Sequence, residues 1–174
     1  HRDLHLSLRR QRQMCISDSY GCVYYTSSKD RIDFAVPFCI GAGKYPTIEI
    51  DETGGIYIIW LSKDEKGVLF SKKIDGEWSG PIEILSSYNL SPPSLAFINN
   101  KLYIGTVSQK GTQCELRISS FDPVDPTVVT KVISHEFTSE TEIRSPSIAK
   151  LGKTFCAAWE EDGDIYYLTK KGGQ

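Results

Sequence analysis

The chain has 174 residues, of which 20 are Lys or Arg and 22 are Asp or Glu, so its formal net charge is -2 and offers no positive surplus for binding nucleic acid. Hydrophobic residues make up 40% of the chain and charged residues 24%, which excludes a disordered polypeptide and is typical of a globular domain. The longest unbroken apolar stretch, residues 56–61, is far shorter than the roughly 20 residues of a membrane span, so none is expected.

Short segments rich in Ile, Val, Tyr, Thr and Phe alternate with clusters of Gly, Asp, Asn, Ser and Pro. This pattern predicts strands joined by turns, and therefore an all-β fold. In the N-terminal part, residues 4–9 or 13–17 provide one strand. Residues 21–27 and 32–40 provide the next two.

Three later strands each open with Pro, then Thr or Ser, then an aliphatic residue. The prolines are Pro46, Pro93 and Pro146, which lie 47 and 53 residues apart. Each opening strand is followed by a turn, a second strand, a polar loop and a third strand, so the spacing is that of a four-stranded unit. The expected second strands are 56–62, 102–108 and 154–160; the third strands are 68–73, 114–119 and 164–170; the fourth strands are 81–86 and 127–134.

A single sheet of this size buries too little apolar surface to be stable, so neighbouring sheets must pack face to face. Four antiparallel strands per repeat, arranged radially, form a β-propeller. We expect about three and a half to four blades in one propeller or partial propeller. A β-sandwich is the alternative, although it does not predict the internal period. The expected blades are 1–43 (partial), 46–86, 93–134 and 146–174 (partial).

Unpaired sheet edges and uncovered blade faces promote aggregation, so they must be covered. The chain could close on itself as a four-bladed ring, pair with a second copy, or be completed by further blades outside it. A start at His1 without an initiator Met and a stop within the last blade favour completion by other protein.

The five cysteines cannot all pair within one chain, and their spacings do not match a zinc knuckle. A hairpin between Cys15 and Cys22 would place these two residues opposite each other, where they could form a disulfide. The other interpretation is that they are reduced thiols packed as small hydrophobic residues. The reduced state is also expected for Cys39, Cys114 and Cys156.

The repeat resembles the sialidase-like β-propellers that are built from BNR or Asp-box blades. Residues 45–51, 55–60, 68–71 and 76–81 resemble a full blade of this class, and the resemblance covers nearly the whole chain. The family's box, S-x-D-x-G-x-T-W, is degenerate here. Ser71 and Trp78 match, but Lys73 replaces the Asp, and the box that begins Ser28-Lys29-Asp30 is one residue short.

In such a box, Ser and Asp side chains bond turn amides while an aromatic residue packs between strands. Packing within the blades is therefore the expected role of four aromatic residues, with ligand stacking as the alternative. These residues are Phe34, Trp60, Trp78 and Trp159.

The resemblance also implies a binding mouth on the top face, where the inner strands begin. Arg144 and Lys44 occupy equivalent positions just before two inner strands, and convergent cations there would bind a carboxylate or sulfate. The alternative is a solvated Arg144 beside Glu140 and Glu142. Tyr88 and Asn89 could provide the ring and amide that sugars require, although turn chemistry explains Asn89 equally well.

A sialidase needs a Tyr nucleophile, an Asp acid/base and three arginines, and only Arg144 is suitably placed. We therefore expect a noncatalytic module that binds a glycan or a protein. The alternative is a fragment of a sialidase-type glycoside hydrolase whose other catalytic residues lie elsewhere. No cofactor or metal motif is found, and His135 lacks the context of a catalytic relay. The resemblance favours an extracellular or cell-surface location.

Overall fold

The structure is a computed structural model that describes residues 12–17, 21–30, 32–139, 144–152, 154–161 and 163–171. These ranges contain fifteen strands, which form four antiparallel sheets. No helix within them is long and apolar enough to cross a membrane. The first sheet consists of β1 (Arg12–Ser17), β2 (Cys22–Ser28) and β3 (Phe38–Ala42); the second of β4 (Lys44–Ile50), β5 (Ile56–Leu61), β6 (Gly67–Ile74), β7 (Glu77–Trp78) and β8 (Ile82–Ser86); the third of β9 (Ser94–Ile98), β10 (Lys101–Lys110), β11 (Gln113–Phe121) and β12 (Thr130–Thr138); the fourth of β13 (Ser147–Leu151), β14 (Thr154–Glu161) and β15 (Asp164–Lys171).

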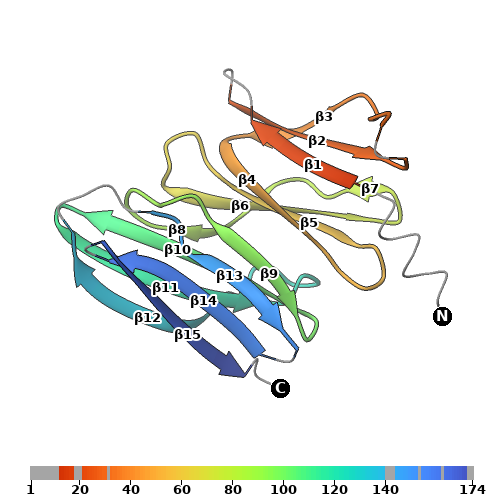
Figure 1. Cartoon of the computed structure of the whole chain (residues 1–174). Coiled ribbons are helices and arrows are strands. Elements are labelled where there is room, and N and C mark those ends of the chain that lie inside the picture. Colours follow the sequence, from red (N-terminus) through yellow and green to blue (C-terminus); the bar gives the residue numbers. More distant parts are fainter. Residues whose placement is uncertain are drawn as a thin grey trace.

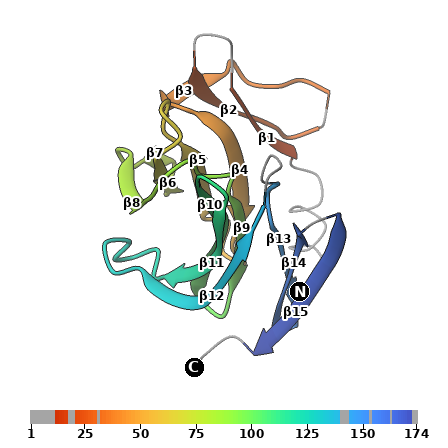
Figure 2. The same ribbon diagram turned by 90° about the vertical axis from the view of Figure 1, so that its left-hand side faces the viewer.

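The four sheets follow one another around an arc, each packed face to face on the next (Figures 1 and 2). Strand β4 contacts β1 on one side and β9 on the other, and β9 in turn contacts β13. The three strands that open near Pro46, Pro93 and Pro146 therefore lie closest to a common axis. This arrangement confirms the expected β-propeller, here a partial one, and excludes the two-layered sandwich.

Separate hydrophobic clusters hold neighbouring sheets together. Val23 and Tyr25 of the first sheet pack with Ile58 of the second, whereas Ile118 of the third packs with Phe155 of the fourth. Between the second and third sheets, the rings of Tyr57 and Phe97 stack with centroids 5.5 Å apart, and Phe70 meets Phe121 edge-on. Each sheet is thus stabilised by its neighbours.

Trp60 is fully buried, which confirms its expected packing role. Its Nε1–H donates a hydrogen bond to the carbonyl oxygen of Ala42, 3.0 Å away in the link between the first and second sheets. Gly43 completes this link with φ 154°, and its backbone lies directly against the Trp60 ring. The tight turn from β3 into β4 therefore depends on a residue without a side chain.

Two of the expected strands, 127–134 and 32–40, start later than the sequence pattern predicts. Strand β12 begins at Thr130 because Asp122 and Asp125 bind the amides of Val124 and Thr127 and so keep this loop in turns. Strand β3 spans Phe38–Ala42, after the polar turn that follows β2. The expected strand at 4–9 lies outside the described residues.

The disulfide of this chain joins Cys22 to Cys39, so both the proposed Cys15–Cys22 bond and the expected reduced state of Cys39 are wrong. The register of β1 with β2 places Tyr25 opposite Cys15, and the Cys15 side chain packs toward the second sheet. Burial raises the pKa of the Cys15 thiol to about 12. Cys114 and Cys156 are free, as expected.

The turn after β2 is held by the Asp30 carboxylate. One of its oxygens accepts hydrogen bonds from the amides of Ile32 (2.9 Å) and Asp33 (3.0 Å) and from the Ser28 hydroxyl (2.9 Å). This is the arrangement expected when a Ser and an Asp staple a hairpin. The amides of Ile32 and Asp33, together with the hydroxyl of Ser28, lower the pKa of Asp30 to about 2.

We expect this turn to loosen in acid. Because its folded-state pKa lies below the ordinary value of 3.8, Asp30 stabilises the turn above about pH 4, and this contribution disappears as the pH falls toward 2. The amide resonances of Ile32 and Asp33, followed by NMR, should titrate with a midpoint near the folded-state value. In Asp30→Asn this titration should be absent. A midpoint at the ordinary value would contradict the expected hydrogen bonds.

Candidate functional site

The inner strands β4, β9 and β13 all begin at the same end of the propeller, the top face, which is on the left in Figure 1. The turns that join β5 to β6, β10 to β11 and β14 to β15 lie at this end as well, as does the loop between β8 and β9. The structure therefore places Lys44, Tyr88, Asn89 and Arg144 on one face, although it does not gather them at one point.

Lys44 forms an ion pair with Glu65, with 2.8 Å between Nζ and Oε1. The hydrogen bond from Lys44 to Glu65 raises the pKa of the lysine. The carbonyl oxygen of Glu65 also accepts a hydrogen bond from the amide of Leu90, 2.9 Å away. Lys44 therefore lies beside the loop between β8 and β9, but its charge is balanced within its own sheet.

Arg144 is paired in the same manner. Its Nη1 lies 2.9 Å from Oε2 of Glu160, at the end of β14, while 73% of its side chain is exposed. Glu140 and Glu142, the neighbours considered from the sequence, lie outside the described residues. In the described part of the chain, no hydrogen bond or ion pair connects Arg144 with Lys44. Lys44 and Arg144 thus each have their own carboxylate.

Tyr88 borders a cavity of about 540 Å³ between the β8–β9 loop and the top of the third sheet. Its ring is 60% exposed, and the Lys110 ammonium group lies 5.2 Å from the ring centroid. The cavity is also lined by side chains that can bond sugar hydroxyls: Ser87, Ser108, Gln109, Gln113, Glu115, Glu136 and Thr138. This cavity, which we call the Tyr88 cavity, offers an aromatic plane next to hydrogen-bonding groups.

Asn89 lies in the same loop as Tyr88 but outside the lining of the cavity. Its φ of 36° is in the left-handed region that asparagine tolerates better than most residues, and its carbonyl oxygen accepts a hydrogen bond from the Gln109 amide at 3.2 Å. The residues that line the Tyr88 cavity do not include Asn89. The geometry is that of a turn residue, the second role considered from the sequence.

Two glutamates that line the Tyr88 cavity were not predicted from the sequence as site residues. Glu115 of β11 and Glu136 of β12 lie directly opposite each other across the strand pair. The hydrogen bond from Ser134 to Glu115 (2.5 Å) lowers the pKa of Glu115, with a further contribution from Lys131. The expected fourth strand ended at Ser134, so Glu136 was not paired with Glu115. A correct strand boundary would have revealed this pair.

His135 connects the third sheet with the fourth. Its Nε2 lies 2.9 Å from Oε2 of Glu161, an oxygen that also accepts a hydrogen bond from the Trp159 indole at 3.4 Å. The His135 and Trp159 rings lie 5.7 Å apart. These contacts give both residues a structural role. Among the described residues, no group of three or more His, Cys, Asp or Glu is arranged to hold a metal ion.

No family model and no curated protein matches this sequence. Solved structures do match. The chain superposes on a GH43 β-1,3-galactosidase with a TM-score of 0.61 and 13% identity, covering 93% of this chain and 40% of the enzyme. The superposition on an exo-β-1,3-galactanase from Clostridium thermocellum has a TM-score of 0.56 and 12% identity, and it covers 94% of this chain and 43% of the galactanase. The superposition on a GH32 β-fructofuranosidase from Bombyx mori has a TM-score of 0.54 and 14% identity, and it covers 92% of this chain and 42% of the enzyme.

The fold resembles part of the β-propeller of these enzymes. The chain spans only about two fifths of these enzymes, and at such low identity the likeness concerns the fold alone. The named enzymes belong to GH43 and GH32, so they carry no evidence for a sialidase type in particular.

Proposed function

We propose that this chain is a noncatalytic binding module and that it binds a glycan in the Tyr88 cavity. The observation that carries this proposal is an exposed tyrosine ring at the edge of a cavity lined by carboxylate, amide and hydroxyl groups. Ligand sites typically combine apolar or aromatic surface with a few polar groups that fix orientation. A sugar ring can stack its C–H face on Tyr88 while its hydroxyls donate to Glu115 and Glu136.

A neutral glycan suits this cavity better than an acidic one. Glu115 is held in its ionised form, and Glu136 lies opposite it. An anionic sugar placed there would meet like charges, which is unfavourable. Lys44 and Arg144, the cations that the sequence suggested for an acidic sugar, are already paired with Glu65 and Glu160, whereas Lys110 of the cavity lies over the Tyr88 ring.

Two carboxylates of the top face, Asp64 and Glu115, support a noncatalytic role. Glycoside hydrolysis generally needs two carboxyl groups about 5 to 10 Å apart, one of them with a raised pKa. The Ser62 hydroxyl lowers the pKa of Asp64, just as Ser134 lowers that of Glu115. Neither group is thus suited to donate a proton at neutral pH.

The second candidate function is that of a fragment of a glycoside hydrolase whose remaining catalytic residues lie outside this chain. It is favoured by the enzymes with the same fold, of which the chain covers about two fifths. In either case, the Cys22–Cys39 disulfide supports an extracellular or cell-surface location, because disulfides persist in oxidising environments.

A glycan array should detect binding to neutral oligosaccharides, and Tyr88→Ala should weaken it about tenfold through the lost stacking surface. Tyr45→Ala is the matched control, since Tyr45 is also an exposed tyrosine on the top face but does not border the cavity. Loss of binding with the control, and not with Tyr88→Ala, would place the site at the axis and contradict the proposal.

Further measurements distinguish the neutral-glycan site from an acidic-glycan site, from catalysis and from protein binding. Binding of acidic glycans that disappears in Lys44→Ala combined with Arg144→Ala would favour the convergent cations considered from the sequence. Turnover of fluorogenic arabinofuranosides, galactosides or sialosides by this chain would overturn the noncatalytic role. Binding to a protein surface in place of all glycans would overturn the ligand class.

A further inference from the structure

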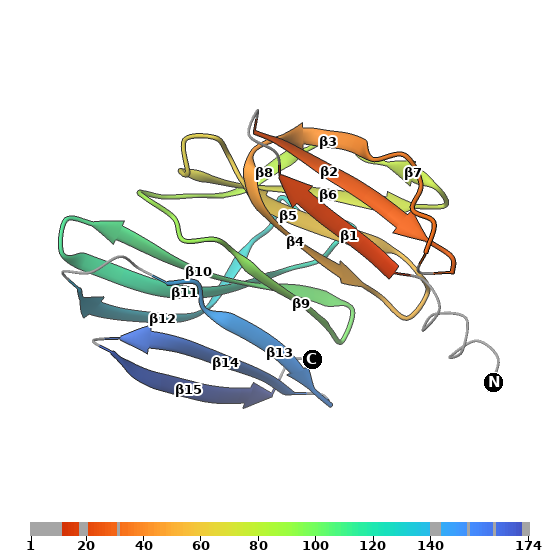
Figure 3. The same cartoon turned by 45° about the horizontal axis from the view of Figure 1, so that its top comes forward.

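A second cavity, with a volume of about 420 Å³, lies between the first and second sheets at the end of the propeller opposite the top face. The end of β2, the turn between β4 and β5, and the short strand β7 meet there, on the right in Figure 3. We call it the Lys73 cavity, and its lining includes Tyr25, Ser27, Ser28, Lys29, Lys73 and Asp75. Its volume falls within the range of small-molecule sites.

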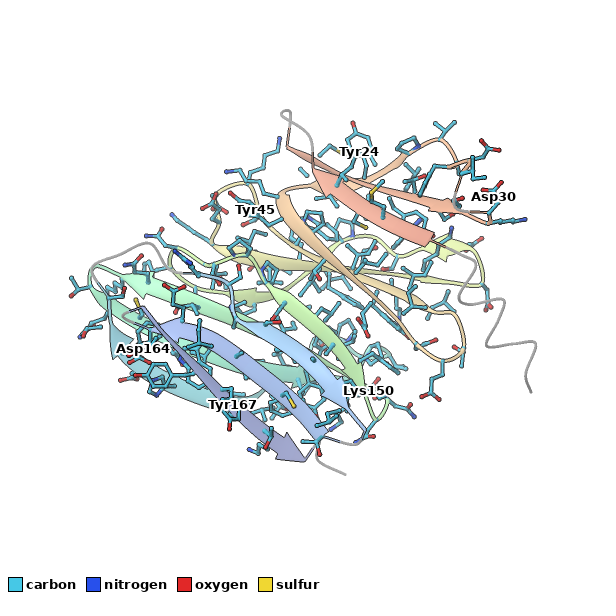
Figure 4. All side chains as sticks on the ribbon, in the orientation of Figure 1. Tyr24, Asp30, Tyr45, Lys150, Asp164 and Tyr167 are labelled. Atoms are coloured by element: carbon cyan, nitrogen blue, oxygen red, sulfur yellow. A yellow bond between two sulfur atoms is a disulfide. The ribbon has the colours of Figure 1, made fainter. Side chains whose placement is uncertain are left out.

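Both degenerate boxes of the sequence contribute a lysine to this cavity. In the first box Lys29 directly precedes Asp30, and in the second Lys73 replaces the aspartate. Asp30, labelled in Figure 4, still accepts hydrogen bonds from two turn amides. The Ser71 hydroxyl likewise donates to the carbonyl oxygen of Ser79, 2.8 Å away. The boxes thus hold their turns through other side chains, and the two lysines are available for another role.

The Lys73 ammonium group is held in place by aromatic rings. Its Nζ lies 5.2 Å from the ring centroid of Tyr25 and 5.8 Å from that of Trp78, and these two rings meet edge-on with centroids 5.0 Å apart. The register of the second sheet places Lys73 beside Ile56 and Trp78, which both pack toward the first sheet. A ring attracts a cation without neutralising its charge. Lys73 is therefore positioned at the cavity while its positive charge remains.

Neither lysine of the cavity forms an ion pair with a carboxylate in the described part of the chain. Lys44, Lys131 and Lys150, by contrast, each have a glutamate oxygen within 3.6 Å of the ammonium nitrogen. The carboxylate among the described lining residues belongs to Asp75, in the turn between β6 and β7. Two ammonium groups therefore face one carboxylate, and this lining has a positive net charge.

We propose that the Lys73 cavity binds a sugar unit that carries a sulfate or phosphate ester. The oxygens of the ester group accept charge-assisted hydrogen bonds from Lys29 and Lys73, and the Ser27 hydroxyl provides a further donor. The Asp75 carboxylate accepts a hydrogen bond from a ring hydroxyl of the same sugar. An inorganic anion would use the lysines but would give Asp75 no donor. The mixed lining therefore favours an ester of a sugar over the free anion.

Titration calorimetry of the full chain with galactose 6-sulfate, galactose 6-phosphate and galactose tests this proposal. At least one of the two esters should bind, about tenfold or more tightly than galactose, and the tighter ester identifies the natural group. Lys73→Ala and Lys29→Ala should each weaken that binding about tenfold, through the loss of one charge-assisted contact. Lys73→Arg keeps the charge and should retain most of the affinity. Added salt should weaken the binding of the ester by screening the lysines.

Lys101→Ala is the matched control for the cavity variants. Lys101 is an exposed lysine at the start of β10, at the same end of the propeller, and it does not line the cavity. Its removal changes the net charge by the same amount and should leave the affinity unchanged. Tyr88→Ala, and Lys44→Ala combined with Arg144→Ala, should also leave it unchanged, so this site and the Tyr88 cavity can fail independently.

Circular dichroism checks that each variant is folded, and Lys73→Arg separates a lost charge from a disturbed sheet. Four results would each overturn the proposal. They are the absence of binding by both esters, equal affinity for galactose and its esters, inorganic sulfate that binds as tightly as the tighter ester, and a loss with Lys101→Ala equal to that with the cavity variants.

Discussion

Replacing Gly43 with alanine is expected to destabilise the protein by about 3 kcal/mol or more, as for the most severe cases of overpacking. A Cβ at this position would overlap the carbonyl oxygen of Leu61 and the ring of Trp60, and its φ of 154° is one that other residues rarely adopt. Trp60 cannot move aside without losing its hydrogen bond to Ala42 and its place in the core.

Urea unfolding measured by tryptophan fluorescence and circular dichroism would give this difference in stability. Gly80→Ala is the matched control, because no atom lies within 4 Å of the Cβ it introduces and its φ is not in the left-handed region. The control should stay within about 0.5 kcal/mol of the wild type. If Gly43→Ala were equally neutral, the close contact of Gly43 with Trp60 would not exist in solution.

Removing the disulfide by Cys22→Ala together with Cys39→Ala should cost about 3 kcal/mol, the value expected for a crosslink that closes a short loop. The bond connects β2 with β3 across a sequence separation of 17 residues, in a sheet whose described residues share a hydrophobic cluster with the second sheet. The loss should therefore appear first as proteolytic cleavage within the first sheet.

Thermal unfolding with and without a reductant would test this expectation. The wild type in reductant should approach the stability of the double variant, which itself should not respond to reductant. Cys156→Ala, which changes a half-buried free thiol, should leave the response to reductant intact. An unchanged melting temperature of the wild type on reduction would contradict a stabilising disulfide.

The propeller could be predicted from the sequence because its repeat is expressed in local features. Proline has no amide hydrogen to donate and is accepted at the start of a strand, so Pro46, Pro93 and Pro146 mark the inner strands. The continuous apolar run 56–61 indicates a strand covered on both faces, and all of its side chains are buried. Neither signal depends on contacts between distant segments.

Register across strands could not be predicted in the same way. A shift of one residue moves every side chain to the other face of a sheet, and the shift is set by turns whose geometry is not local to the strand. Glu136 faces Glu115 because β12 starts after the Asp122 and Asp125 turns and because the register of β11 with β12 shifts between Ile118 and Ser119. The repeat predicts that Lys44, Tyr88 and Arg144 lie on the top face. Their contacts with Glu65, Lys110 and Glu160 depend on how separate strands and loops pack, which the repeat does not specify.

The succession of hydrophobic clusters has a thermodynamic consequence. Among the described residues, the second and third sheets share clusters with a neighbour on each face, whereas the first and fourth sheets each share clusters with one neighbour. In such a linear array the free energy is approximately a sum of nearest-neighbour terms. The first and fourth sheets can then open independently of each other, because neither opening disturbs the interface between the second and third sheets.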